Sequence, residues 1–345
     1  MSNNARQGFR SKGGVSIADV ARLAGVSSQT VSRVSNGSDQ VRPETRDKVI
    51  EAMRMLGYSP NIAARALRQG EFKAIGVLGN RFDRTGESLT TSALIAAATA
   101  QDYAVTIVTV QENKLGDWDH AAIRLSSQAI DGLVILRAEH TPEQFALPAG
   151  FPVAVADSRL AGLYPAVTLN HEQGSVAATK HLLGLGHRQV HHLAGLKGSD
   201  PSVARLLPWQ RVLEQNGIRP PEPFYGDWSA QSGYEIGKKI AQRGDVTALY
   251  CANDEMAMGV LHAFHEAGLR VPEDISVVGF DDLSLSAHLP VPLTTVRQDY
   301  QMIGKHLFDL VKEQLEKGRD AVARRRVVVP TQLIVRSTTA APRFN

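Results

Sequence analysis

Apolar residues near the N-terminus recur at the three- and four-residue spacing that is typical of helices. The first such segment, which begins at Ile17, ends at Gly25, the residue best suited to stop a helix in a left-handed conformation. Ser27 then stands where an N-cap belongs, and a second helix is expected over 28–35. Two short helices joined by a glycine-containing turn are the helix-turn-helix pattern.

A third amphipathic segment completes a small all-α head, residues 15–60. It has Pro43 in its first turn and ends at Gly57. When a helix-turn-helix reads DNA, the start of its second helix enters the major groove. Gln29 and Arg33 share one face of that helix, and their side chains suit the edges of adenine and guanine. The other candidate DNA-binding residues of this surface are Ser28, Thr30, Ser32, Asn36 and Gln40.

The pattern alone leaves a second interpretation open, a three-helix bundle with an ordinary polar face. The charge of the chain bears on this choice. Residues 1–70 hold 11 Lys and Arg against 5 Asp and Glu, whereas the rest of the chain holds 27 against 30. A basic head on a slightly acidic body suggests a polyanionic partner for the head, although basic N-termini are also common as solvated tails.

From Lys73 onward, β-branched runs alternate with helical stretches. The expected strands are 74–78, 105–110, 132–136, 153–156, 190–193, 248–252 and 275–280, and the expected helices include 88–101, 117–128, 171–184, 230–242 and 254–267. This alternation predicts an α/β body with parallel sheets covered by helices on both sides. Ligands of such sheets bind beyond the carboxyl ends of the strands, where Asp157, Asn253 and Asp281 stand.

Specific residues narrow these alternatives. The segments that do so are Ile17-Ala18-Asp19-Val20-Ala21, Ala24-Gly25-Val26-Ser27, Thr30-Val31-Ser32-Arg33-Val34, Gly57-Tyr58-Ser59-Pro60-Asn61 and Ala63-Ala64-Arg65-Ala66-Leu67. They closely resemble the DNA-binding head of the LacI/GalR family of bacterial transcriptional repressors. Further along, Gly226-Asp227-Trp228-Ser229-Ala230, Ala252-Asn253-Asp254 and residues 274–282 resemble the lactose-type, galactoside-responsive members.

The resemblance implies two doubly wound parallel-sheet lobes, like those of a periplasmic binding protein, behind the helix-turn-helix head. The implied first lobe is 72–170 with 300–327, and the second is 171–299 with 328–338. The stretch 61–71 is implied to be a hinge, because in the family paired hinge helices form on the operator. Eight residues from Asn61 are too few for a stable isolated helix. Leu67 matches the family's leucine that wedges into the minor groove.

The resemblance also implies a sugar-binding cleft between the lobes. Its matching residues are Asp157, Arg205, Trp228, Asn253, Asp281 and Gln298. Polar side chains of these types hydrogen-bond sugar hydroxyls, and an aromatic ring packs against the C–H face of a pyranose. Each residue also has an ordinary structural alternative. These alternatives are a helix cap for Asp157, Asp281 or Asn253, a surface ion pair for Arg205, and a place in the core for Trp228.

Two residues and one segment depart from the lactose-type pattern. Arg137 replaces a small polar amide, and its charge favours an acidic or phosphorylated ligand unless it pairs with Glu139. Pro208 lies in a stretch that is helical in relatives, where we expect it to remove one hydrogen bond and shift the start of the helix. The segment 80–83 also differs from relatives, so the opposite wall of the cleft is not predicted.

Enzymatic, cofactor and metal functions are not expected. Gly184 and Gly186 lack the third glycine of a dinucleotide fingerprint, and no Gly-x-Ser-x-Gly motif occurs. His187, His191 and His192 have no carboxylate between them that would complete a metal site.

The resemblance implies three partners: double-stranded operator DNA, a sugar effector and a second copy of the chain. A dimer rather than a tetramer is expected, since no C-terminal leucine heptad is present. A cytoplasmic location without a membrane segment is expected, because the chain has one cysteine, no secretory signal and no long apolar run. A solute-binding protein for transport is the alternative function, and it predicts a signal peptide and no basic head.

Overall fold

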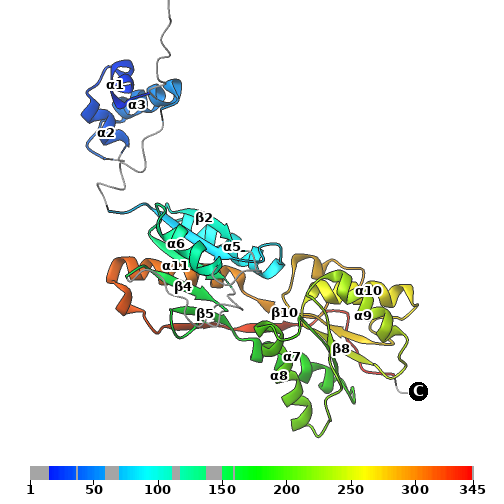
Figure 1. The fold of residues 1–345 in the computed structure, drawn as a ribbon. Coiled ribbons are helices and arrows are strands. Elements are labelled where there is room, and N and C mark those ends of the chain that lie inside the picture. The colour runs from blue at the N-terminus through cyan, green and yellow to red at the C-terminus, as the bar shows by residue number, and fades with distance from the viewer. Residues whose placement is uncertain are drawn as a thin grey trace, which may run out of the picture. The chain divides into compact units, whose positions relative to one another are not determined.

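The computed structural model describes residues 15–35, 38–58, 70–110, 117–136, 150–157 and 160–343. The chain divides into two compact units, Met1–Phe72 and Lys73–Asn345, which we call the head and the body. Figure 1 shows the helices and strands of each unit. Of the predicted hinge 61–71, only Gly70 and Glu71 belong to the described residues.

Three helices form the head: α1 (Ile17–Ala24), α2 (Ser28–Ser35) and α3 (Pro43–Leu56). Ser16 caps α1 in a capping box with Asp19, and Gly25 ends this helix with a φ of 67°. The Oγ of Ser27 accepts a hydrogen bond from the backbone N–H of Thr30 at 3.1 Å, which caps the start of α2. These contacts confirm the predicted boundaries of both helices. The buried apolar residues of the head are Val20, Ala21, Val31, Val34, Val41, Val49 and Ala52.

The body contains two parallel sheets, and we call each sheet with its helices a lobe. In the first lobe six strands follow the order β11-β5-β4-β3-β1-β2, and every neighbouring pair is parallel. These strands are β1 (Ala74–Gly79), β2 (Ala104–Thr109), β3 (Gly132–Leu136), β4 (Val153–Ala156), β5 (Ala166–Leu169) and β11 (Arg326–Val329). The helices of this lobe are α5 (Thr85–Thr99), α6 (Asp117–Ser126) and α11 (Tyr300–Lys317).

Strand β1 shows how helices cover both faces of the first sheet. Its Ile75 and Val77 pack in one core with residues of α5 and α11. A Cβ atom on Gly76, between them, would instead meet Leu125 of α6 on the opposite face. Because successive strand residues point to opposite faces, a strand buried on both sides must be apolar throughout, as β1 is.

The second lobe repeats this arrangement with a smaller sheet, in the parallel order β7-β6-β8-β9. Its strands are β6 (His191–Ala194), β7 (Phe224–Tyr225), β8 (Ala248–Cys251) and β9 (Ser276–Val278), and its helices are α7 (His171–Gly184), α8 (Asp200–Gln215), α9 (Ala230–Ala241) and α10 (Asp254–Glu266). Leu249 packs with α9 and α10, whereas Tyr250 packs with α7 and α8. The two helix pairs therefore lie on opposite faces of the sheet, as Figure 1 shows.

Within the described residues the chain passes between the lobes three times: from β5 to α7, from β10 (Thr295–Gln298) to α11, and from β11 to β12 (Thr331–Ile334). Strands β10 and β12 pair with each other in antiparallel fashion. Two short 3₁₀ turns complete the body, η1 (Ser284–Ala287) and η2 (Arg319–Ala321). The predicted boundary after residue 327 falls inside β11, which pairs with β5, so Val328 and Val329 belong to the first sheet.

The predicted parallel sheets are confirmed, and one local expectation is wrong. Pro208 does not shift the start of its helix, because α8 begins at Asp200 and continues through Pro208 to Gln215. The missing N–H removes one hydrogen bond of the helix interior, which tertiary packing tolerates: Pro208 and its neighbour Trp209 are both buried. Strand β5 and helix α11 were absent from the expected elements.

Candidate functional site

The predicted DNA-contact residues that the structure describes lie on and just after α2. Ser28, Gln29 and Arg33 are exposed, while Thr30 and Ser32 are half-buried. The Thr30 hydroxyl lies 2.9 Å from the Ser27 hydroxyl, so this residue also helps to fix the start of α2. The side chains of Val31 and Val34 on the opposite face are buried in the head core. The helix is therefore anchored by one face and presents Gln29 and Arg33 on the other.

Gln40 follows α2 and is exposed, and its backbone N–H donates to the Ser38 hydroxyl at 3.3 Å. In addition, the Arg46 guanidinium of α3 donates to the Ser38 carbonyl at 2.8 Å, which ties this loop to the third helix. Asn36, Asn61 and Leu67, the remaining predicted DNA-contact residues, lie outside the described residues.

A cavity of about 220 Å³ lies between the lobes of the body. Its lining residues are Arg81, Asp83, Arg84, Thr85, Gly86, Glu87, Arg205, Asp227, Trp228, Ser229, Asn253, Glu255 and Asp281. Four of the six predicted effector residues are among them: Arg205, Trp228, Asn253 and Asp281. They come from α8, the loop before α9, the start of α10 and the loop after β9. Only the folded body brings these distant positions together.

Arg205 is the most enclosed of the four, with 2% of its surface exposed. Its Nη1 donates to the carbonyl of Ala252 and lies 3.6 Å from Oδ1 of Asp281. The guanidinium also lies 4.0 Å from the centre of the Phe280 ring and 5.5 Å from that of Trp228. A surface ion pair, the ordinary alternative for this residue, is therefore wrong.

Asn253 combines a structural role with its place at the cavity. Its Oδ1 accepts from the backbone N–H of Met256 at 3.0 Å, which makes it the N-cap of α10. Its Nδ2 donates to the carbonyl of Trp228 at 2.9 Å. Asn253 thus links the first turn of α10 to the loop that carries the tryptophan.

Trp228 packs closely against Gly195. A Cβ atom on Gly195 would lie 2.2 Å from the Trp228 ring, so a larger residue there would displace it. Trp228 belongs to the core of the second lobe and lines the cavity as well, so both of its proposed roles apply. Its buried Nε1 has no hydrogen-bond partner among the described residues.

Gln298 lies behind the cavity rather than in its lining. It is buried, and its Nε2 donates to Oδ1 of Asp281. Both Asp281 and Trp228 adopt positive φ angles, 122° and 79°, which side chains other than glycine rarely adopt. Backbone strain of this kind persists where the surrounding contacts hold it, and it gathers at binding sites.

The structure does not bring Asp157 to the cavity. This residue lines a separate groove of about 500 Å³ with His171, Arg211 and Arg326. Its Oδ1 accepts from the backbone N–H of Leu169 at 3.0 Å, and its Oδ2 lies 3.8 Å from Nε2 of His171. Of the six predicted cleft residues, four line the cavity and Gln298 lies behind it. Asp157, which follows β4, faces the start of α7 in the separate groove.

Sequence reasoning missed the wall that the first lobe contributes. Arg81, Arg84 and Glu87 line it, beside Thr85, whose hydroxyl donates to the carboxylate of Glu255 in the second lobe. The positions of these residues were a usable signal, because they follow the carboxyl end of β1, where ligands of parallel sheets bind. Arg137, the other departure in this region, lies outside the described residues.

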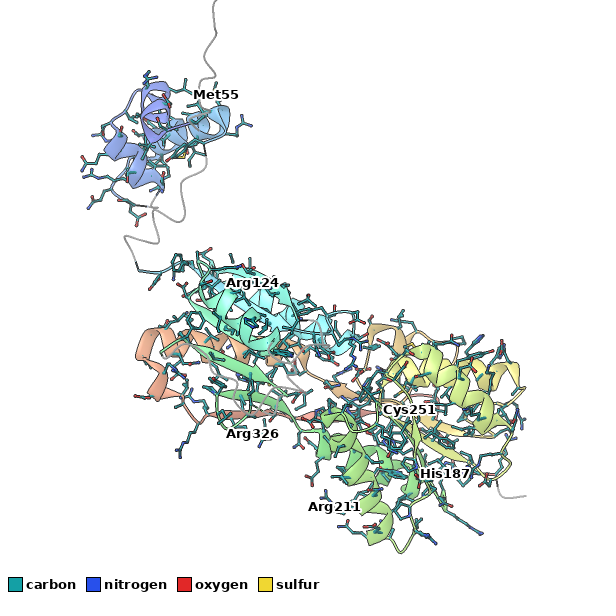
Figure 2. The ribbon with its side chains drawn as sticks, in the orientation of Figure 1. Met55, Arg124, His187, Arg211, Cys251 and Arg326 are labelled. Atoms are coloured by element: carbon teal, nitrogen blue, oxygen red, sulfur yellow. The ribbon has the colours of Figure 1, made fainter. Side chains whose placement is uncertain are left out.

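Burial sets the ionisation of several groups around the second sheet. It raises the pKa of Asp254 to about 6, with the Asp282 charge adding to the effect. It also raises the pKa of Cys251, labelled in Figure 2, so this thiol stays protonated in the core. Burial lowers the pKa of His192 to about 3, and this neutral ring stacks on Tyr250 at 4.5 Å. Within the described ranges, no group of three His, Cys, Asp or Glu is arranged to hold a metal ion.

Both units of the chain are similar to known proteins. Residues 16–61 match the family described as bacterial regulatory proteins, lacI family, and residues 179–339 match the periplasmic binding protein-like domain. The lactose operon repressor of Escherichia coli (strain K12) is 35% identical over 332 residues, which cover 95% of this chain and 91% of that repressor. The chain belongs to the LacI family. It is a ligand-responsive, DNA-binding transcriptional repressor of a non-enzymatic family, and the transport alternative is wrong.

Solved structures agree with this assignment across both units. The lac repressor dimer bound to operator and the anti-inducer ONPF is similar with a TM-score of 0.82 and 34% identity, over 95% of this chain and 99% of that one. A complex of the transcriptional regulator CelR with cellobiose has a TM-score of 0.69 and 28% identity, over 94% and 99%. Among the described helices of this LacI-family chain, none is long and apolar enough to cross a membrane.

Proposed function

We propose that this repressor acts as a homodimer on a palindromic operator and that a sugar in the interlobe cavity changes its affinity for DNA. The observation that carries the proposal is the convergence of Arg205, Trp228, Asn253 and Asp281 on one cavity. Amide, guanidinium and carboxylate groups beside an aromatic ring are the chemistry that binds sugar hydroxyls. One similar structure is a complex with cellobiose, and another holds ONPF and operator DNA, which supports this class of ligand.

On the DNA side, α2 of each subunit would enter the major groove. Gln29 and Arg33 would contact base edges, and Ser28, Thr30, Ser32, Asn36 and Gln40 would contact bases or phosphates. A two-fold dimer places its two recognition helices about one helical turn apart, so the operator would have two inverted half-sites. The similar structure of the lac repressor dimer on its operator supports this arrangement.

The hinge would couple the two sites. We infer that residues 61–71 form a short helix on the operator and that Leu67 wedges into the minor groove there, with Asn61 at the start of the helix. So short a helix is marginal in water. A coupling free energy of a few kcal/mol between the lobe arrangement and the hinge would therefore decide whether the helix forms. The protein would act in the cytoplasm, where bacterial DNA lies.

A gel-shift titration on the promoter of the chain's own gene tests the proposal, with a panel of glycosides and sugar phosphates added to the complex. We expect binding at nanomolar protein concentration and a change of at least fivefold in affinity with one ligand of the panel. Light scattering should give the mass of a dimer. The absence of any DNA binding, or a stable monomer, would overturn it.

A further inference from the structure

Two residues that the family resemblance did not supply meet across the cavity. Thr85 is the first residue of α5 in the first lobe, and Glu255 lies in the first turn of α10 in the second lobe. The hydroxyl of Thr85 donates to Oε1 of Glu255, a contact between positions 170 residues apart. Both residues line the cavity, so this hydrogen bond holds the carboxylate at its wall.

The second oxygen of Glu255 remains able to accept. Among the described residues, no donor other than the Thr85 hydroxyl reaches this carboxylate. The same cavity is lined by Trp228, a residue 9% exposed, whose Nε1–H has no acceptor among the described residues. A ligand hydroxyl can both donate and accept hydrogen bonds, so hydroxyl groups satisfy an unpaired acceptor and an unpaired donor in one site.

The charges of the described lining residues argue against an anionic ligand. Five carboxylates, those of Asp83, Glu87, Asp227, Glu255 and Asp281, face three guanidinium groups. Each guanidinium already lies near a carboxylate: Arg81 is 3.0 Å from Asp83, Arg84 is 4.0 Å from Glu87, and Arg205 is 3.6 Å from Asp281. A phosphate placed here would meet the charge of Glu255, and the described lining residues offer no guanidinium that is not already near a carboxylate. Like charges repel, and more strongly in a partly desolvated site than in water.

The size of the cavity narrows the ligand further. The cavity has a volume of about 220 Å³, which is below the roughly 300–1,000 Å³ that is typical of pockets for drug-sized ligands. A single pyranose ring with its hydroxyls fills such a space.

We propose that Glu255 is an effector-binding residue, that Thr85 positions it, and that the cavity therefore takes a neutral monosaccharide unit in preference to its phosphate ester. This inference rests on the proposed function, since it assigns the chemistry of the same cavity. It differs from the expectation that Arg137 favours an acidic or phosphorylated ligand, and it agrees with the alternative in which Arg137 pairs with Glu139; both residues lie outside the described residues.

Titration calorimetry on the full-length protein tests the assignment. The probes are galactose, glucose, mannose, ribose and the phosphate esters of each sugar. We expect the tightest ligand to be a neutral sugar and its phosphate to bind at least a hundredfold more weakly. Glu255→Gln should weaken the neutral sugar about tenfold and narrow the gap to its phosphate, because one charge-assisted hydrogen bond and the repulsion both disappear.

The variant Thr85→Val tests whether Thr85 positions the Glu255 carboxylate for effector binding. We expect it to weaken the neutral sugar two- to fivefold and to lower the preference over the phosphate, whereas the double variant should bind no more weakly than Glu255→Gln alone. A loss of packing alone would leave the sugar-to-phosphate ratio unchanged. Glu266→Gln is the matched control, since Glu266 lies at the other end of α10 and accepts from Tyr234 at 2.6 Å on the surface.

Each remaining outcome overturns the inference. If a phosphate ester is the tightest ligand, or if Glu255→Gln binds the neutral sugar as the wild type does, Glu255 has no such role, and the proposed function stands without it. If no member of the panel binds the wild type, the sugar assignment of the proposed function fails and this inference fails with it. Glu255→Gln and Glu266→Gln should have the same unfolding midpoint and operator affinity, which shows that Glu255→Gln is folded. If these values differ, the sugar-to-phosphate preference of Thr85→Val decides whether Glu255 binds the effector.

Discussion

The head and the body differ in how they present their proposed functional side chains. In the head, Gln29 and Arg33 are exposed on α2, and separate residues such as Val31 form the core. In the body, Arg205 and Asp281 line the cavity and are themselves buried and paired. On the proposed assignment of these residues, the head keeps recognition and stability on different residues, whereas the body places both on the same ones. Ligand binding in the proposed cavity would consequently act on contacts that hold the second lobe together.

The largest effect that tests this contrast is expected for Arg205→Ala. The change leaves Asp281 buried without its cation, which costs about 3–5 kcal/mol in a protein interior. We expect the free energy of unfolding of the body to fall by that amount in urea titration, together with the loss of any ligand response. Arg211→Ala is the control on the same helix, since Arg211 is half-exposed beside Glu172 and should change stability by less than about 1 kcal/mol. Equal effects for the two variants would contradict the contrast.

A second test uses the buried carboxylate next to Asn253. Asp254 accepts from the Leu283 N–H at 2.9 Å, from the Ser286 hydroxyl at 2.6 Å and from the Thr295 hydroxyl, and burial raises its pKa from 3.8 to about 6. An acid whose pKa is higher in the folded state contributes stability below its unfolded pKa and loses that contribution as the pH rises through the folded value.

Stability should therefore fall between about pH 4 and pH 6, by on the order of 2–3 kcal/mol. Asp254→Asn cannot ionise, so the decrease should disappear from its pH profile. Urea titrations of both proteins at half-unit steps from pH 4 to pH 7 measure the difference. Parallel profiles would show that another group causes the pH dependence.

The third prediction concerns the head, where a substitution should change operator binding and leave stability unchanged. An arginine that contacts a guanine edge contributes about 1–3 kcal/mol of discrimination, so Arg33→Ala should weaken operator binding roughly tenfold to a hundredfold. Since Arg33 is exposed, the free energy of unfolding should change by less than about 0.5 kcal/mol. Arg54→Ala serves as control, because Arg54 lies on α3 and pairs with Glu51 at 2.8 Å. Fluorescence anisotropy on operator and on base-substituted DNA measures both affinity and discrimination.

The same contrast explains which features the sequence could predict. The helices of the head depend on local signals, such as the caps at Ser16 and Ser27 and the stop at Gly25, and these signals are readable within a few residues. Strand runs of the body are equally local, so the parallel sheets were predicted correctly. The cavity depends on long-range packing, which no local pattern reports.

Two residues illustrate this limit in the body. Asp157 shares with Asp281 a position just after a strand, yet it faces a different groove. Arg84 follows β1 of the same sheet as Asp157 and does line the cavity, so a position after a strand does not decide which hollow a side chain enters. Glu255 lies two residues after Asn253 and looks like an ordinary first-turn carboxylate of α10. Only its contact with Thr85, in the other lobe, shows that it faces the cavity.

The smallest expected effect tests whether DNA recognition and stability depend on different residues in the head. Ser27→Ala removes the cap of α2 that accepts from the Thr30 N–H at 3.1 Å, which should cost about 1 kcal/mol. Ser16→Ala removes the corresponding cap of α1 and should cost a similar amount. Hydrogen exchange should then be faster in α2 for the first variant and in α1 for the second.

If only Ser27→Ala weakens operator binding, the order of α2 itself contributes to recognition, because DNA must then restore the helix start before Gln29 and Arg33 can reach the bases. If both variants weaken it equally, the head responds as one cooperative unit, and its stability limits recognition after all.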